Sequence, residues 1–254
     1  MAQQQRQRAE VIERGNIYFL YRPKVGEHEP EGLDDVQRFY LVLEPEDGVL
    51  VRLIVIGRKR LPDIGEHERN WATVEATASQ AKELAPALGE QHYDTKTSGE
   101  RSQPAARPAG EGTYLLVRRG RDLHLAYELE LPERPGPVQE ALNIAPAASF
   151  VVSIANPERR RGSPARRAAD QRPDYPDPLQ ECFRGRRFAG EEPRLLDYEG
   201  AELLLIGASE DPEEELDVAI EAGHGSARQA DIFRHLKLQE GRHPREPLLR
   251  GQWA

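Results

Sequence analysis

The sequence predicts an α+β fold in which β-strands dominate, built from two related antiparallel or mixed sheet units with packed helices. Short runs rich in Val, Ile, Leu, Tyr and Phe alternate with Pro, Gly and Asp turns, as in β-rich proteins. Residues 15–62 and 112–157 contain such runs in a similar order. A few other windows place apolar residues at helical spacing.

The first predicted unit spans residues 15–93. Strands are expected over 17–21, 36–43 and 49–56, because these runs are apolar and end at Pro or Gly. Glu46-Asp47-Gly48 carries the Asp-Gly signature of a tight turn between the last two. Residues 1–14 are polar and rich in Gln and Arg, which predicts a flexible N-terminal arm.

A helix over residues 71–86 is expected to pack on this first sheet. Its apolar positions recur at helical spacing: Trp71, Val74, Ala78, Ala81 and Leu84. Residues 94–111 are poor in large apolar side chains and rich in Pro, Gly, Ser and Ala. They predict a linker, which places the domain boundary here.

The second predicted unit spans residues 112–254. A strand pair is expected over 114–131 with its turn near Gly120, followed by a short helix through Val138 and Leu142 and a buried strand over 149–155.

A mobile loop over residues 156–178, which are rich in Arg and Pro, interrupts this unit. The C-terminal portion is expected to contain strands over 195–198 and 201–206. A helix then starts with Asp211 as N-cap and Pro212 as its first residue.

The two units share spacings that suggest duplication. Tyr18 and Arg22 are four residues apart, as are Tyr114 and Arg118. Tyr40 precedes Pro45 as Tyr127 precedes Pro132, and each set leads into an apolar strand. The alternative is chance convergence, because β-rich chains use Tyr, Val, Leu and Pro for local reasons. Duplication predicts that Tyr18 and Tyr114 occupy equivalent places.

The composition and charge of the chain make several classes of function unlikely. The chain of 254 residues has a formal net charge of −9, which makes general nucleic-acid binding unlikely. Its single cysteine, Cys182, excludes an intrachain disulfide and a cluster of cysteine ligands. No signal peptide and no membrane span is visible, so a cytoplasmic protein is expected.

The chain lacks the common sequence motifs of enzymes. It has no glycine-rich dinucleotide loop, phosphate-binding loop, zinc-protease helix or nucleophile elbow. No cofactor is therefore expected. His28 and His67, each flanked by glutamates, provide a candidate metal site. A solvated acidic loop is the favoured alternative for both.

Arginines at strand ends give the main ligand-binding hypothesis. A guanidinium can bind a carboxylate or phosphate through two parallel hydrogen bonds. The candidate residues for a small anion are Arg22, Arg118, Tyr18, Tyr114, Arg58 and Arg60. Pairing of these arginines with the abundant surface carboxylates is the simpler explanation.

A basic zone inside this acidic chain suggests an RNA-binding accessory role. Its residues are Arg159, Arg160, Arg161, Arg166 and Arg167. Few aromatic side chains are interleaved with them, so a solvated loop is favoured.

The stretches RGNIYFLYRP, GLDDVQRFYLVLEP, GRKRLPDI and EALNIAPAASFVVSIANP resemble those of a conserved family of bacterial proteins without an assigned function. The resemblance covers most of the chain and implies a bacterial, cytoplasmic protein, but no activity or catalytic residue.

The preferred interpretation of the whole sequence is a non-enzymatic binding or interaction protein that recognises a small anionic ligand or an acidic protein partner. The alternative is a hydrolase or transferase whose site is assembled from distant Asp, Glu, His and Arg residues.

Overall fold

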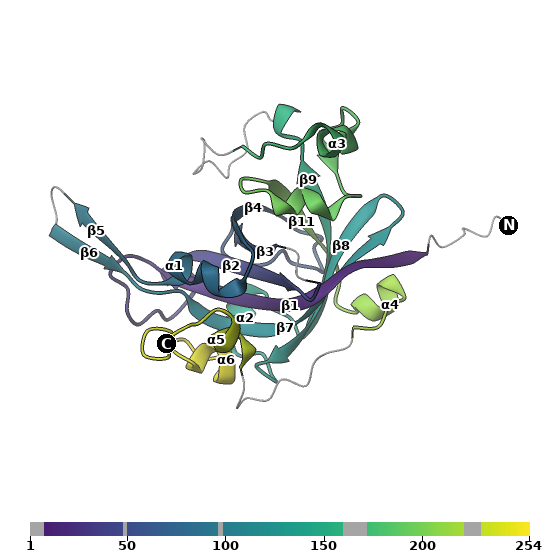
Figure 1. Cartoon of the computed structure of the whole chain (residues 1–254). Helices are drawn as coiled ribbons and strands as arrows, with labels where there is room; N and C mark the ends of the chain where they lie inside the picture. Colours follow the sequence, from purple (N-terminus) through teal and green to yellow (C-terminus); the bar gives the residue numbers. More distant parts are fainter. Residues whose placement is uncertain (1–7, 48–49, 96–98, 160–171, 221–229) are drawn as a thin grey trace.

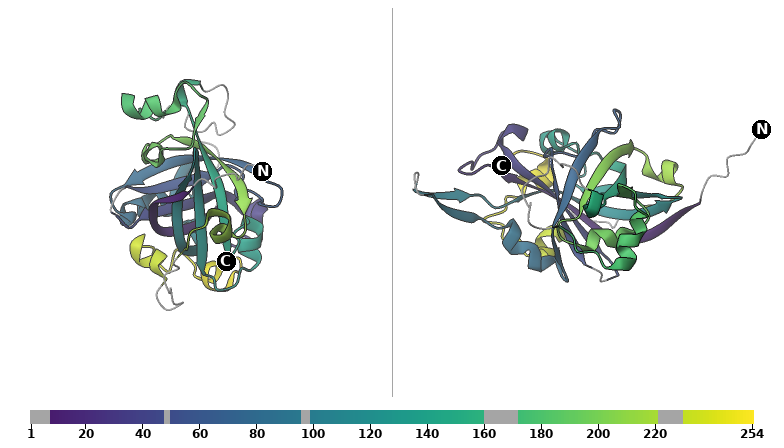
Figure 2. Two further views of the ribbon diagram at one scale, coloured as in Figure 1. Left: turned by 90° about the vertical axis from the view of Figure 1, so that its right-hand side faces the viewer. Right: turned by 90° about the horizontal axis from the view of Figure 1, so that it is seen from above.

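The computed structural model describes residues 8–47, 50–95, 99–159, 172–220 and 230–254. Within these residues the strands form one closed, eight-stranded antiparallel barrel (Figures 1 and 2). The barrel strands are β1 (Ala9–Pro23), β2 (Val36–Pro45), β3 (Val51–Ile56), β4 (Arg69–Ala78), β7 (Arg107–Arg119), β8 (Asp122–Leu131), β9 (Ala147–Ala155) and β11 (Glu202–Ser209).

Pairing between β8 and β9 closes the sheet. The strands run in the order β9-β11-β4-β3-β2-β1-β7-β8, and β8 then pairs with β9 from Leu123 opposite Val152 to Glu128 opposite Ala147. A two-residue strand, β10 (Phe188–Ala189), adds to β9. The predicted two sheet units are therefore wrong, because both halves of the chain contribute to a single closed sheet.

Alternation along each strand sends one set of side chains into the barrel lumen and the other set outward. The lumen is filled by aliphatic and aromatic side chains from all eight strands, including Phe19, Phe39, Tyr127 and Phe150. Phe19 stands edge-on to Tyr127 at 5.1 Å between ring centroids. A filled lumen is expected of a barrel this small.

Short helices cover parts of the outer face. The 3₁₀-helix η2 (Ala81–Leu84) and α1 (Ala85–Leu88) pack on it, as do α5 (Asp231–His235) and α6 (Glu246–Arg250). A second outer patch, centred on Val117, is covered by Leu216 of α4 (Pro212–Leu216). Asp211 caps α4 as predicted, since its Oδ1 accepts a hydrogen bond from Glu214 N at 3.0 Å.

The remaining elements lie near the barrel ends or project from it. They are α2 (Pro137–Leu142), α3 (Asp177–Gln180) and the 3₁₀-helices η1 (Leu33–Asp35), η3 (Pro157–Arg159), η4 (Glu181–Phe183) and η5 (Pro193–Asp197). A hairpin of β5 (Gln91–Thr95) and β6 (Gly99–Gln103) extends away from the barrel in Figures 1 and 2. No helix among the described residues is long and apolar enough to cross a membrane.

Two predicted elements have the wrong type. The helix over 71–86 is not formed: residues 71–78 belong to β4, and only the short helices η2 and α1 follow. Burial alternates along Asn70 to Val74, and this period of two is obscured in the sequence by the small apolar alanines at 72, 76 and 78. Residues 195–198, predicted as a strand, lie mostly in η5.

Parts of the predicted linker and of the predicted N-terminal arm form strands in the structure. Residues 107–111 of the linker belong to β7, and residues 9–14 of the predicted N-terminal arm belong to β1. The central part of the predicted mobile loop, residues 160–171, lies outside the described residues.

The residue-level duplication is wrong, because matched residues face opposite sides of the sheet. Tyr18 points outward and Tyr114 into the lumen. Tyr40 and Tyr127 differ in the same way. An inward residue cannot be structurally equivalent to an outward one, since a one-residue slip exchanges the two faces.

An ion cluster occupies one end of the barrel. Arg52 is buried and donates to both carboxylate oxygens of Glu13, at 2.6 and 2.9 Å, and to Asp197 at 2.8 Å. The Tyr114 hydroxyl also donates to Glu13, at 2.6 Å. Burial alone would lower the pKa of Arg52, but hydrogen bonds and charge from Glu13, together with Asp197, raise it.

Replacing Arg52 by alanine leaves Glu13 and Asp197 without their cation in a nearly buried setting. We expect the free energy of unfolding to fall by about 3–5 kcal/mol, as when one partner of a buried ion pair is removed. Urea unfolding at pH 7 measures the change. The matched control is Arg38→Ala, which removes an exposed pair with Glu75 and should cost less than about 1 kcal/mol. Equal losses in the two variants would contradict this interpretation.

Candidate functional site

A buried arginine without a carboxylate partner lies at the opposite end of the barrel from the ion cluster. Arg107 begins β7 and pairs directly with Tyr21 of β1, so both side chains lie on the same face of the sheet. Tyr21 belongs to the lumen cluster. The exposed fractions are only 5 % for Arg107 and 0 % for Tyr21, so both polar groups are removed from solvent.

A β-bulge sets this orientation. Along β1 and β7 the pairing runs from Phe19 opposite Gly110 to Leu20 opposite Pro108, which leaves Ala109 as an extra residue. Without the extra residue, Arg107 would lie opposite Arg22 and face outward, because one residue of register exchanges the two faces. The bulge therefore turns the guanidinium towards Tyr21.

Hydrogen bonding at this pair is incomplete. Arg107 Nη2 donates to the backbone oxygen of His28 at 2.7 Å, whereas its Nη1 has no hydrogen-bond partner. The Tyr21 hydroxyl also has none, although the backbone amide of Ala254 lies near it. Within the described part of the chain, Arg107 forms no ion pair, and Glu27 influences it only through its charge.

Burial dominates the titration of both groups. It lowers the pKa of Arg107, with the charges of Tyr21 and Glu27 opposing it. It raises the pKa of Tyr21 to about 12, against the opposing effects of Arg107 and of the Ala254 backbone. At neutral pH the site consequently offers a guanidinium N–H and a phenolic O–H as donors.

Arg22, the first arginine predicted to bind a ligand, makes four hydrogen bonds within the protein. It points to the outer face and donates to the backbone oxygens of Ala87 at 2.7 Å, Gly89 at 2.8 Å and Pro104 at 3.0 Å. Its Nε donates to the Tyr40 hydroxyl at 3.2 Å. Arg22 therefore anchors the chain that follows η2 and has little capacity left for an anion.

The other predicted arginines are paired with carboxylates and do not meet Arg22. Arg118 pairs with Glu10 at 2.7 Å, twelve residues before Arg22 along β1, or roughly 40 Å at 3.3 Å per residue. Arg58 and Arg60 both contact Glu68. The structure thus separates the predicted residues rather than collecting them in one site.

The predicted tyrosines lie in two unrelated clusters. Tyr114 belongs to the ion cluster of Arg52. Tyr18 is on the outer face, where its hydroxyl donates to Glu44 at 2.9 Å and lies 2.8 Å from His235 Nδ1. Burial, reinforced by the charge of Glu44, raises the pKa of Tyr18 far above its ordinary value. Tyr18 stays protonated and helps to hold the end of α5.

The start of α5 is held by a second buried carboxylate. Glu111, opposite Tyr18, accepts hydrogen bonds from the backbone N–H groups of Asp231 at 3.2 Å and Ile232 at 2.9 Å. Burial raises the pKa of Glu111 to about 7, the two hydrogen bonds oppose the rise, and the charges of Asp231 and Glu130 add to it. We therefore expect the docking of α5 to depend on pH near neutrality.

The predicted metal and nucleic-acid residues do not gather into sites. His28 and His67 are exposed in different loops, and His67 Nδ1 lies 3.0 Å from Gly207 O. Among the described residues, no group of three or more His, Cys, Asp or Glu side chains could hold a metal ion. Residues Arg160, Arg161, Arg166 and Arg167 lie outside the described residues, and Arg159 ends η3.

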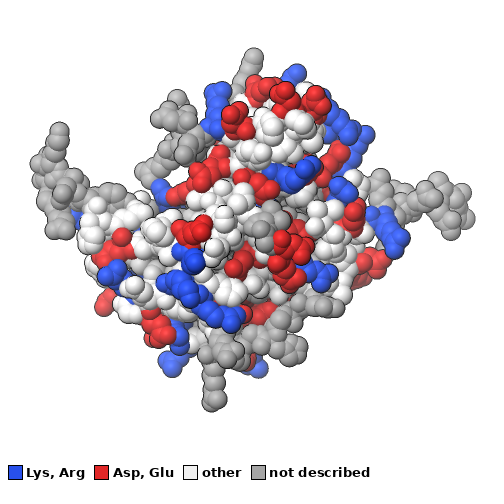
Figure 3. Space-filling model, viewed as in Figure 1, with Lys and Arg blue, Asp and Glu red and all other residues white. Residues whose placement is uncertain are grey.

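Charge is mixed across the face seen in Figure 1. Acidic and basic side chains are interspersed there without merging into one continuous basic surface (Figure 3). This face therefore gives no support to a nucleic-acid interface, which requires clustered Lys and Arg side chains.

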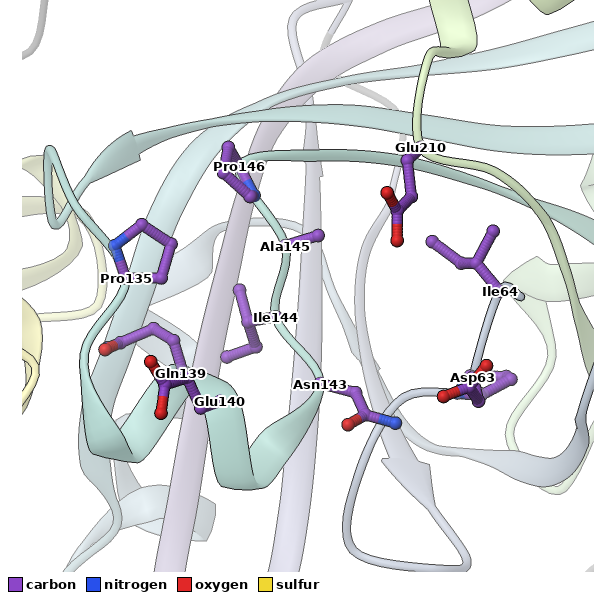
Figure 4. A pocket seen from close by; sticks show the side chains of 11 residues that line it. Asp63, Ile64, Pro135, Gln139, Glu140, Asn143, Ile144, Ala145, Pro146 and Glu210 are labelled. Atoms are coloured by element: carbon purple, nitrogen blue, oxygen red, sulfur yellow. The ribbon is translucent and has the colours of Figure 1, made fainter. Parts of the chain in front are cut away.

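A surface pocket of about 280 Å³ lies between α2, the β3–β4 connection and the residue after β11 (Figure 4). Its lining carries the carboxylates of Asp63, Glu140 and Glu210 but no arginine or lysine. Asp63 also accepts a hydrogen bond from Glu66 N, and Asn143 donates to Leu61 O. The pocket has no cation that could bind an anion.

Sequence reasoning missed Arg107, because it lies in a run of Ala, Pro and Gly predicted as a linker. Its pairing with Tyr21 depends on a bulge at Ala109, which no local pattern indicates. No protein-family model matches the chain, and neither a curated protein nor a solved structure matches it.

Replacing Glu111 by glutamine should remove a pH-dependent term from the stability of the protein. A carboxyl group whose pKa rises from 4.5 to about 7 on folding contributes stability below pH 4.5, and this contribution is lost as pH rises through 7. Relative to wild type, the variant should therefore gain stability between pH 5 and 9, by at most about 3 kcal/mol. Urea unfolding across this range provides the measurement.

The exposed carboxylate of Glu133 provides a control for the Glu111→Gln experiment. Glu133→Gln should keep the wild-type pH dependence. A Glu111→Gln profile that runs parallel to wild type from pH 5 to 9 would show that Glu111 does not titrate with a raised pKa.

Proposed function

We propose that the protein is a non-enzymatic binding protein that recognises an anionic group through Arg107 and Tyr21. The supporting observation is that a buried guanidinium has an Nη1 amino group without a hydrogen-bond partner and has no carboxylate partner, beside a buried tyrosine hydroxyl whose O–H has no acceptor. A buried charge without a partner costs several kcal/mol. An anion that paired with Arg107 would recover part of that cost on binding.

The chemistry of the two side chains favours an oxygen anion. The guanidinium is always charged, and its planar arrangement of donors fits carboxylate and phosphate oxygens. The Tyr21 hydroxyl keeps its proton at neutral pH and adds a second donor from the neighbouring strand. The proposed setting remains the bacterial cytoplasm, which rests on the sequence features alone.

Calorimetric titration with sodium acetate, benzoate and phosphate, in a zwitterionic buffer of low ionic strength, tests the anion site. We expect at least one of these anions to bind the wild type. Arg107→Gln should weaken that binding by about thirtyfold or more, because truncating a buried charge pair costs at least about 2 kcal/mol.

Arg118→Gln is the matched control, because Arg118 is a partly exposed arginine on the same strand and is paired with Glu10. It should leave anion binding unchanged. The proposal is wrong if none of the three anions binds, or if Arg107→Gln binds as tightly as wild type.

A further inference from the structure

The charge around Arg107 limits the charge of its ligand. Arg107 supplies one positive charge, while Glu27 is near enough to act on it and carries a negative one. Arg22, the neighbour of Tyr21 along β1, points to the other face and is occupied by backbone oxygens. The single charge of Arg107 can pair with a monoanion, whereas a dianion such as hydrogen phosphate would leave one unpaired negative charge in a buried setting that already feels the charge of Glu27.

The unused donors match a group with two oxygens. Arg107 Nη1–H and the Tyr21 O–H come from directly paired residues on adjacent strands. One carboxylate can accept from both, with one oxygen on each donor. A third or fourth oxygen would face the apolar lumen side chains that surround Tyr21, including Phe39 opposite it on β2.

The remaining surroundings are aromatic. The Trp253 ring is half-buried and stands edge-on to Tyr21, with 5.1 Å between ring centroids. Trp253 also packs against the lumen cluster. The carbon attached to a bound carboxylate would therefore meet aromatic rings rather than water, which favours an apolar or aromatic substituent.

Trp253 is carried by the irregular segment that follows α6. Gly251, with φ of 64°, accepts a hydrogen bond from Val138 N at 3.0 Å and lies against Gly136. Two residues later, the Trp253 ring contacts Tyr21. A side-chain rotation at Trp253 could uncover the site without breaking a strand pairing of the barrel, since Trp253 belongs to no strand.

We propose that the ligand is a monocarboxylate with an apolar or aromatic substituent, held by Arg107 and Tyr21 through its two oxygens and by Trp253 through its substituent. This inference rests on the proposed function and goes further by naming the class of ligand. It predicts a rank order among anions that a general anion site would not show.

Benzoate, acetate and phosphate distinguish the possibilities when titrated separately into the wild-type protein. Benzoate should bind tightest, acetate about tenfold or more weakly because it lacks the ring, and phosphate weakest. Tyr21→Phe should weaken benzoate about tenfold through the lost hydrogen bond, while the ring remains packed. Trp253→Ala should weaken benzoate and leave acetate unchanged. Circular dichroism confirms that both variants are folded.

The outcomes separate this inference from the proposed function. If phosphate binds tightest and Arg107→Gln abolishes its binding, the anion site stands and the monocarboxylate inference is wrong. The inference also fails if benzoate and acetate bind equally, or if Tyr21→Phe has no effect. If no anion binds, both proposals fall.

Discussion

Hydrogen bonds between β8 and β9 close the sheet, and this closure determines which surfaces of the protein are available to a ligand or a partner. A closed barrel of eight strands has an interior that its own side chains fill, and here rings such as Phe19, Tyr127 and Phe150 occupy it. Closure also leaves the barrel strands without long free edges for a partner strand. Recognition is thereby directed to the barrel ends, the outer face and the segments that project from it.

The barrel buries three arginines among its described residues, and the three differ in which groups compensate the buried charge. Arg52 is neutralised by Glu13 and Asp197 at one end. Arg22 on the outer face is satisfied by backbone oxygens and the Tyr40 hydroxyl. Arg107 differs from both, because it has no carboxylate partner and only its Nη2 donates to a backbone oxygen, while its Nη1 has no hydrogen-bond partner. Because of this difference we propose Arg107, and neither of the other two, as the binding residue.

Local patterns in the sequence identified much of the secondary structure but not its closure. The runs at 17–21 and 36–43 lie within strands, the run at 201–206 matches β11 from its second residue onward, and Asp211 caps its helix. The predicted helix at 71–86 failed because the alanines of β4 match both a helical and an alternating pattern. Which strands pair is a long-range property, and nothing local to β8 or β9 indicates that they complete a barrel.

The site was harder to predict than the fold for a similar reason. Arginines at the ends of clear strands, such as Arg22 and Arg118, are conspicuous in the sequence, yet both are satisfied by the protein itself. Arg107 lies in a segment with few strand-forming residues, and it faces Tyr21 only because of the bulge at Ala109. Unmet hydrogen-bonding capacity is a property of the folded surroundings and cannot be read from residue type.

We propose that Arg107 carries a stability cost that its ligand offsets, and the stability of Arg107→Met tests this most directly. In benzoate-free buffer the variant should be more stable than wild type towards urea, because an apolar side chain replaces an unpaired buried charge. In saturating benzoate the order should reverse, since only wild type gains stability from a ligand bound to the folded state. A variant less stable than wild type in benzoate-free buffer, with no response of wild type to benzoate, would contradict the account and make Arg107 a structural residue.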